Sequence, residues 1–169
     1  VLSLYENDLT GSIPTQIALL TDMEDMWLNT NQLSSTIPTE FGLLTKLSVL
    51  SLFENDLTGS IPTQIALLAN TEKMQLHLNQ LSFAIPTELG LLTKLSRLYL
   101  DSNDLLGSIP TEIGHLTDML DLQLYFNQLS STIPTELGLL TKLSVLSLYE
   151  NDLTGSIPTQ IALLTDMED

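Results

Sequence analysis

Cysteine is absent from the 169-residue sequence, and its absence excludes several kinds of chemistry. Without a thiol, the chain cannot form a disulfide bond, a thiolate nucleophile, or a cysteine-held zinc or iron–sulfur site. Glycosylation sequons of the form N-x-Ser/Thr are also absent. No apolar run approaches the roughly 20 residues that a transmembrane helix needs, so we expect no membrane-spanning segment in this stretch.

Basic residues are scarce, with five Lys and Arg against 21 Asp and Glu, and the formal net charge is -16. A field of this sign repels phosphate groups, so nucleic acid is not an expected partner. Aromatic residues are few as well, whereas leucine occurs 40 times. This imbalance indicates a core that is built mainly from one residue type, leucine.

Proline and asparagine both recur at a fixed interval of 24 residues. Such a period predicts a solenoid, in which each unit forms one turn and buries its apolar residues only against its neighbours. The prolines are Pro14, Pro38, Pro62, Pro86, Pro110, Pro134 and Pro158. The asparagines are Asn7, Asn31, Asn55, Asn79, Asn103, Asn127 and Asn151.

Residues 47–70 illustrate one turn. Leucine alternates with other residues over 49–53, which predicts a short strand with one buried face. Asn55 follows this strand, and its amide can both donate to and accept from the backbone of adjacent turns. We therefore expect the seven asparagines to form a structural ladder. Pro62 has no N–H and suits a position outside the main hydrogen-bonded sheet.

The pattern L-x-x-L-x-L-x-x-N-x-L-x-G-x-I-P-x-x-[LI]-G-x-L-T resembles the plant-type leucine-rich repeat, and the match covers essentially the whole chain. This family includes plant receptor ectodomains and polygalacturonase inhibitors, and similar repeats occur in algal and protist proteins. The resemblance implies an α/β repeat solenoid, a right-handed superhelix with a concave parallel β-sheet and short 3-10 or irregular convex segments. It also implies a receptor-like protein that is extracellular or at the cell surface.

A second period spans two turns, because units with N-D-L-T-G-S-I-P-T alternate with units that read N-Q-L-S-S-T-I-P-T. Residues 1–25 and 145–169 are identical. We expect residues 1–169 to form a single array of about seven turns. Polar capping units are missing from it, so we expect an uncapped fragment of a longer protein.

Three features depart from the repeat. Thr71 replaces the Leu or Met of other turns, and a change of this kind in a core typically costs about 2–4 kcal/mol. Phe83 occupies a glycine column, and because it adopts positive φ only at a cost, its turn is expected to differ. A leucine column interrupted by His115 is expected to be buried, and exposure would instead suggest lateral packing. Its members are Leu19, Leu43, Leu67, Leu91, Leu139 and Leu163.

Most of the aromatic residues fall on the outward-facing columns of the predicted strands. Exposed aromatic side chains on a concave sheet are typical anchors of a binding interface. The alternative is cross-strand stacking that only stabilises the sheet. The candidate aromatic ligand-binding residues are Tyr5, Trp27, Phe53, Tyr99, Tyr125, Phe126 and Tyr149.

Lys73 and Arg97 occupy one column in adjacent turns, about 4.8 Å apart by strand spacing. They are the only bases that are predicted on the concave face, and His77 and Asp101 complete the polar candidates. This group predicts a polar specificity site within the aromatic surface. The alternative is ordinary charge pairing, with Asp121 as the partner of Arg97.

We predict a non-catalytic scaffold that uses no cofactor or metal and binds a protein, peptide or glycan on its concave face. His77 lacks the convergent ligands of a metal site and the neighbours of a hydrolytic triad. One alternative is a structural array that packs laterally through its flanks, with self-association. Another is an ice- or surface-binding ladder of threonines, one after each proline. This ladder comprises Thr15, Thr39, Thr63, Thr87, Thr111, Thr135 and Thr159.

Overall fold

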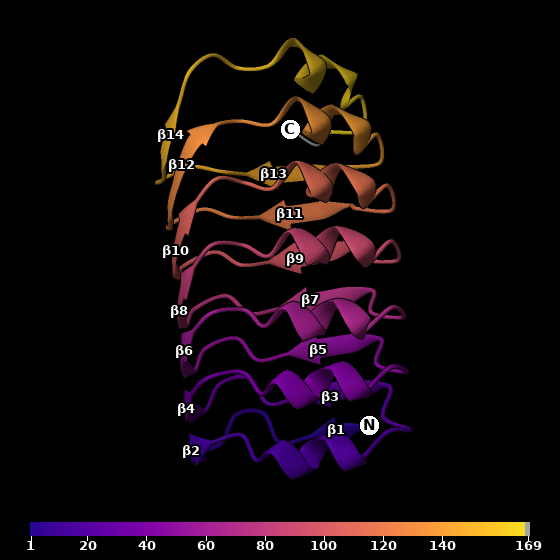
Figure 1. Cartoon of the computed structure of the whole chain (residues 1–169), viewed down its shortest axis with the longest axis vertical. Coiled ribbons are helices and arrows are strands. Elements are labelled where there is room, and N and C mark those ends of the chain that lie inside the picture. The colour runs from indigo at the N-terminus through magenta and orange to yellow at the C-terminus, as the bar shows by residue number, and fades with distance from the viewer. Residues whose placement is uncertain (168–169) are drawn as a thin grey trace.

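The structure is a computed structural model that describes residues 1–167, in which the chain forms a stack of similar turns (Figure 1). Each turn passes through one parallel β-sheet, then a second parallel β-sheet, then a short 3-10 helix. The chain rises through the stack in sequence order, so consecutive turns are neighbours in space. This arrangement confirms the predicted leucine-rich-repeat solenoid, with its parallel sheet and its 3-10 segments on the convex side.

The outward side of the first sheet is the predicted concave face. Its strands are β1 (Leu2–Ser3), β3 (Asp25–Trp27), β5 (Val49–Ser51), β7 (Lys73–Gln75), β9 (Arg97–Tyr99), β11 (Asp121–Gln123) and β13 (Val145–Ser147). The second sheet lies at the left in Figure 1. Its strands are β2 (Thr10–Ser12), β4 (Gln32–Ser35), β6 (Asp56–Gly59), β8 (Gln80–Phe83), β10 (Asp104–Gly107), β12 (Gln128–Thr132) and β14 (Asp152–Thr154).

The convex face carries a 3-10 helix from every turn, each directly after the proline of that turn. The helices are η1 (Thr15–Leu19), η2 (Thr39–Leu43), η3 (Thr63–Leu67), η4 (Thr87–Leu91), η5 (Thr111–His115), η6 (Thr135–Leu139) and η7 (Thr159–Leu163). One apolar core, filled by the same columns in each turn, runs between this face and the two sheets. Each turn therefore buries its leucines chiefly against the turns on either side.

The predicted asparagine ladder is confirmed, and Asn79 shows its geometry. The side-chain Nδ2 of Asn79 donates to the backbone oxygens of Leu52, Leu76 and His77 at 3.0, 3.1 and 3.2 Å. Its Oδ1 accepts from the N–H of Leu57 at 3.0 Å. One buried amide thus satisfies backbone groups in its own turn and in the preceding one.

Thr71 is fully buried in the core column that it was expected to weaken. Its hydroxyl donates a hydrogen bond to the backbone oxygen of Leu47 at 2.9 Å. A buried hydroxyl that is hydrogen-bonded avoids the cost of an unpaired polar group. The smaller volume of threonine therefore remains the only reason to expect weakness at this position.

Phe83 corrects one prediction, because its turn does not differ from the others. It has φ of +71°, close to the +77° of Gly59, and Ser35 and Ser131 adopt the same conformation. Its strand pairs in parallel with β6 and β10, and this pairing imposes the backbone of the glycine turns. The Phe83 ring consequently projects outward, with 60% of the residue exposed.

Replacement of Phe83 by glycine is expected to raise the free energy of unfolding by about 0.5–1 kcal/mol. Glycine relieves the cost of a left-handed backbone, and this gain outweighs the extra flexibility that it gives the unfolded chain. Urea unfolding monitored by circular dichroism would measure the change. Ser82→Gly, one residue earlier at ordinary strand φ, is the control and should lower stability by about 0.5–1 kcal/mol. A destabilised Phe83→Gly chain would contradict the prediction.

The two-turn alternation has a steric basis between neighbouring turns of the second sheet. A methyl group built at Gly59 would lie 2.9 Å from Cγ2 of Thr36, and one at Gly155 would lie 2.8 Å from Cγ2 of Thr132. At Gly107 the facing residue is Ala84, and the corresponding distance is 3.7 Å. Each Thr therefore fits because a glycine occupies the next turn.

The leucine column interrupted by His115 is exposed, which corrects the expectation that it is buried. Its six leucines are between 53% and 78% exposed. In a 3-10 helix, residues three apart lie on the same side. Leu43 therefore shares the outward side of η2 with Glu40, whereas Phe41 and Leu44 point into the core. We call these six leucines the leucine stripe.

Candidate functional site

The concave face brings the predicted site residues into continuous columns. Parallel pairing aligns Lys73 with both Val49 and Arg97, and Arg97 in turn with Asp121. The same in-register pairing continues over the whole first sheet. The outward side chains of different turns therefore form one surface rather than separate patches.

An aromatic stack occupies the middle of this face. The rings of Phe53 and His77 are stacked, with centroids 4.5 Å apart and an interplanar angle of 10°. His77 also meets the edge of Tyr99 at 5.7 Å. Burial lowers the pKa of His77, although the Asp101 carboxylate acts in the opposite direction. We therefore describe His77 as a neutral, stacked ring at neutral pH.

A second aromatic cluster begins in the next turn, after β11. Tyr125 and Tyr149 stack at 4.5 Å with an interplanar angle of 6°. Phe126 packs its edge against both rings, at 5.6 and 5.4 Å. Cross-strand stacking, the alternative role for the aromatic residues, is therefore real, but these rings also keep surface that faces solvent.

A hollow of about 450 Å³ lies on the N-terminal half of the concave face. Lys73 places its Nζ over the ring of Trp27, 5.8 Å from the centroid. Tyr5 and Phe53 also line the hollow. The Oε1 of Gln75 lies in its wall, buried and without a hydrogen-bond partner. Sequence reasoning missed Gln75, although its place in the column of Trp27 and Tyr99 could have identified it.

Lys73 and Arg97 are paired in register, and within residues 1–167 neither forms a salt bridge. Burial, together with the charge of Arg97, lowers the pKa of Lys73. The expected pairing of Arg97 with Asp121 is wrong. Asp121 instead accepts hydrogen bonds from the hydroxyl of Tyr99 and from Nε2 of Gln123, both at 2.7 Å. The two cations are thus adjacent and available.

The two inner tyrosines of the concave face are held in their neutral forms. Burial, followed by the hydrogen bond to Asp121, raises the pKa of Tyr99 to about 12. Burial and the Asp101 carboxylate raise the pKa of Tyr125 to about 12. Both phenols therefore remain hydrogen-bonding groups throughout the physiological range.

Asp101 was predicted as a ligand-binding residue, but its side chain does not face solvent. The residue is only 3% exposed, and its Oδ2 accepts a hydrogen bond from the hydroxyl of Ser102 at 3.3 Å. Asp101 therefore lies in an outward-facing column but is not accessible to a ligand. Asp101 affects the surface through its charge rather than through direct contact.

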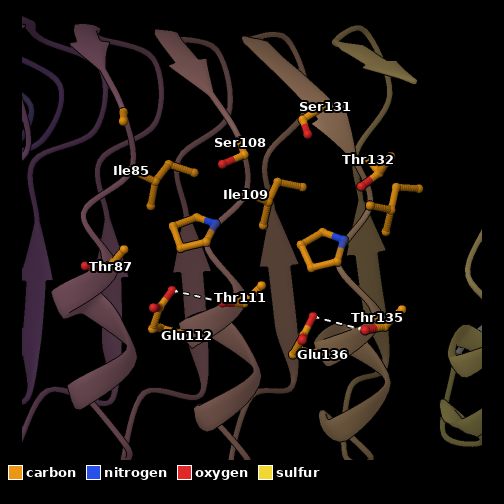
Figure 2. Close-up of a pocket in the computed structure, with 14 residues that line it drawn as sticks. Ile85, Thr87, Ser108, Ile109, Thr111, Glu112, Ser131, Thr132, Thr135 and Glu136 are labelled. Atoms are coloured by element: carbon orange, nitrogen blue, oxygen red, sulfur yellow. Dashed lines mark hydrogen bonds between the residues drawn. The ribbon is translucent and has the colours of Figure 1, made fainter. Parts of the chain in front are cut away.

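A second hollow, of about 530 Å³, lies on the side of the stack between the second sheet and the 3-10 helices (Figure 2). Ile85, Ile109 and corresponding residues of the next turn line it. Thr111 and Thr135 donate to the carboxylates of Glu112 and Glu136, shown as dashed lines. Because the same residue types recur in each turn, this hollow carries little of the sequence variety that recognition needs.

Within residues 1–167, no helix has both the length and the apolar character of a bilayer-spanning segment. No group of three or more His, Asp or Glu side chains in that part of the chain is arranged to hold a metal ion.

Comparisons with known proteins agree with this geometry. The Leucine Rich Repeat family model matches residues 94–116 and 142–164. The chain is similar to the plant peptide hormone receptor RGFR1, solved in complex with RGF2, at 32% identity and a TM-score of 0.92. The match covers 97% of this chain and 26% of the receptor chain. No curated protein sequence matches the chain.

A second similar structure is the Arabidopsis receptor kinase HAESA, in complex with the peptide hormone IDA and the co-receptor SERK1. The identity is 34% and the TM-score 0.93, over 98% of this chain and 28% of that one. The chain therefore spans about a quarter of the length of either receptor chain.

Proposed function

We propose that this chain, which belongs to the plant-type leucine-rich-repeat family, is a non-catalytic module that binds an extended peptide on its concave face. The observation that carries the proposal is the pair of adjacent cations, Lys73 and Arg97, which form no salt bridge within residues 1–167. They lie beside a hollow lined by aromatic residues. RGFR1 and HAESA, which share this fold, were solved with peptide hormones.

The two cations select an anionic group of the ligand. Charge-assisted hydrogen bonds to a carboxylate are stronger than those between neutral groups. The chain as a whole carries a formal charge of -16, so its field repels a strongly acidic ligand. The preferred peptide therefore combines one carboxylate, placed at Lys73 and Arg97, with a neutral or basic remainder.

The aromatic residues supply the apolar part of the contact. Trp27 and Phe53 lie in the turns before the cation pair, Tyr99 lies in the same strand as Arg97, and all three present partly exposed rings. Large rings that are already held by stacking lose little conformational freedom when a ligand covers them. We further propose that the module belongs to a receptor-like protein and acts outside the cell or at its surface.

Selection from a phage-displayed library of random peptides tests this proposal. Peptides enriched on the chain should share an acidic residue or use a free C-terminal carboxylate. Combined Lys73→Met and Arg97→Gln substitutions should weaken their binding by at least about tenfold. Lys142→Met, on the convex face, is the matched control and should have little effect. Equal binding to the two variants would overturn the proposal, as would unchanged binding after Trp27→Ala and Tyr99→Ala.

A further inference from the structure

The convex face has a regular pattern of charges on both sides of the leucine stripe. Residues three apart in a 3-10 helix share one side. In the second turn, this relation places Glu40 next to Leu43 on the outward side. Thr45 and Lys46 are the exposed residues between the buried Leu44 and Leu47, and Lys46 lies three residues after Leu43. In each turn, we call the position of Glu40, the stripe position and the position of Lys46 a row, with the stripe position at its centre.

The leucine stripe is an apolar surface that His115 interrupts in the fifth turn. Leu67 leans over the preceding turn, and its Cδ1 lies 3.1 Å from the position of a methyl group built on Gly42. Leu67 therefore bridges two neighbouring turns. An apolar surface that extends along a whole molecule and has a polar rim is characteristic of an interaction site.

The ends of the rows carry matched charges. Rows that contain Lys at one end contain Glu at the other: Glu40 with Lys46, Glu88 with Lys94, and Glu136 with Lys142. In rows without Lys, the Glu position is Gln16, Gln64 or Gln160, and only the row of His115 has Glu112 instead. Lysine therefore recurs every second turn, always with Glu at the other end of its row, whereas the remaining rows carry Asp or Asn at the lysine position.

We propose that the convex face binds a second copy of this chain through the leucine stripe. The two copies are related by a twofold axis parallel to the length of the stack, so that equal turns face each other. This rotation exchanges the two ends of each row. Lys46 then faces Glu40 of the partner subunit, and the same holds for Lys94 with Glu88 and for Lys142 with Glu136.

The charges select this arrangement over its antiparallel counterpart. A twofold axis across the stack at the fourth turn would place Lys94 against Lys94 of the partner subunit, and Lys46 against Lys142. In the parallel arrangement, all three Glu–Lys rows are complementary on both sides of the stripe. Turns are spaced like strands, at about 4.8 Å, so equal rows stay in register along the interface.

Existing contacts hold the lysines in place without occupying them fully. Nζ of Lys46 donates to Asp22, and Nζ of Lys142 to Asp118, both at 2.6 Å. Nζ of Lys94 donates to Asn70 at 2.7 Å. An ammonium group has three donors, so each lysine can also bind a carboxylate of the partner subunit.

Sedimentation equilibrium on the 169-residue chain, at concentrations up to the order of 100 μM, is the first test. We expect a dimer that does not grow into larger species. Combined Leu67→Ser and Leu91→Ser should weaken dimerisation by more than about tenfold, because both copies lose the contact. The concave variant Lys73→Met/Arg97→Gln should dimerise normally, which separates this proposal from the proposed function. A wild-type chain that stays monomeric would overturn it.

Charge reversal tests the arrangement itself. Lys46→Glu, Lys94→Glu and Lys142→Glu together should give a monomer, and so should Glu40→Lys, Glu88→Lys and Glu136→Lys together. A mixture of the two variants should form a dimer that contains one of each. Both variants remain net acidic, so their association cannot come from opposite overall charges. Failure of the mixture to associate would rule out the proposed pairing.

Single cysteines distinguish the two orientations, since the chain has no cysteine of its own. Leu43→Cys and Leu139→Cys should each form an intermolecular disulfide with the same residue of the partner subunit under mild oxidation. The antiparallel arrangement predicts such a bond only near Leu91. Leu106→Cys, exposed on the second sheet, controls for random collision. Equal cross-linking of Leu106→Cys and Leu43→Cys would contradict the proposal.

Discussion

Replacement of Asn79 by alanine is expected to lower the free energy of unfolding by about 3 kcal/mol or more. The substitution removes three donated hydrogen bonds and one accepted hydrogen bond; all are buried except the one to His77, which is partly buried. Each backbone group that is left unpaired in the interior costs about 1–3 kcal/mol. The damage also spans two turns, so the coupling between neighbouring repeats weakens along with the turn itself.

The position along the ladder provides the control for this prediction. Asn7 is exposed, and its Nδ2 donates only to the backbone oxygens of Leu4 and Tyr5, in its own turn. Asn7→Ala should therefore cost less than about 1 kcal/mol. Guanidinium unfolding of both variants, followed by circular dichroism, gives the comparison. Equal losses at the two positions would show that buried inter-turn hydrogen bonds are not the source of the effect.

A second large effect is expected at Gly90, in the η4 helix. A methyl group there would lie 2.4 Å from the backbone oxygen of Glu112 and 2.7 Å from its Cβ. Backbone cannot move aside as a flexible side chain can, so η5 must shift away from η4. We expect Gly90→Ala to lower the free energy of unfolding by about 2–3 kcal/mol, the upper part of the usual range for overpacking.

Gly107→Ala separates crowding from backbone conformation. Gly107 has φ of +81°, but a methyl group there would meet only Cβ of Ala84, at 3.7 Å. Its cost should be confined to the left-handed backbone, about 1 kcal/mol. Thermal unfolding of both variants would provide the measurement. A Gly90→Ala chain no less stable than Gly107→Ala would mean that neighbouring 3-10 helices can separate easily.

The fold could be predicted because two independent residue ladders set the length of every turn. Asn55 and Pro62 recur with the same interval, so strand, bend and helix fall at the same place in each repeat. Each asparagine also had a physical role that its amide chemistry dictates, and the hydrogen bonds of Asn79 fulfil it.

The errors arose where local geometry, rather than residue type, decides the outcome. Leu43 is apolar and was therefore expected inside, but the periodicity of a 3-10 helix places it beside Glu40. Phe83 was expected to change its turn, but pairing with two flanking strands fixes the backbone irrespective of the side chain. In both cases the backbone geometry of the repeat outweighs the preference of the single residue.

For the charged residues of the concave face, the sequence predicted which side chains are adjacent but not which of them bond to each other. Strand register does bring Arg97 beside Asp121. Asp121 nevertheless binds the hydroxyl of Tyr99, a residue of the same strand as Arg97. Side chains that share a neighbourhood compete for one acceptor, and the order of residues does not reveal which of them bonds to it.

The fit between Thr36 and Gly59 also limits how such an array can change its length by recombination. Loss of residues 37–60, one turn, would bring Thr36 opposite Phe83, where a side chain replaces the hydrogen of glycine. Loss or gain of two turns keeps every threonine opposite a glycine. Loss of this single turn should therefore be tolerated less well than loss of two turns, or 48 residues, and the identical segments 1–25 and 145–169 are separated by three such two-turn steps.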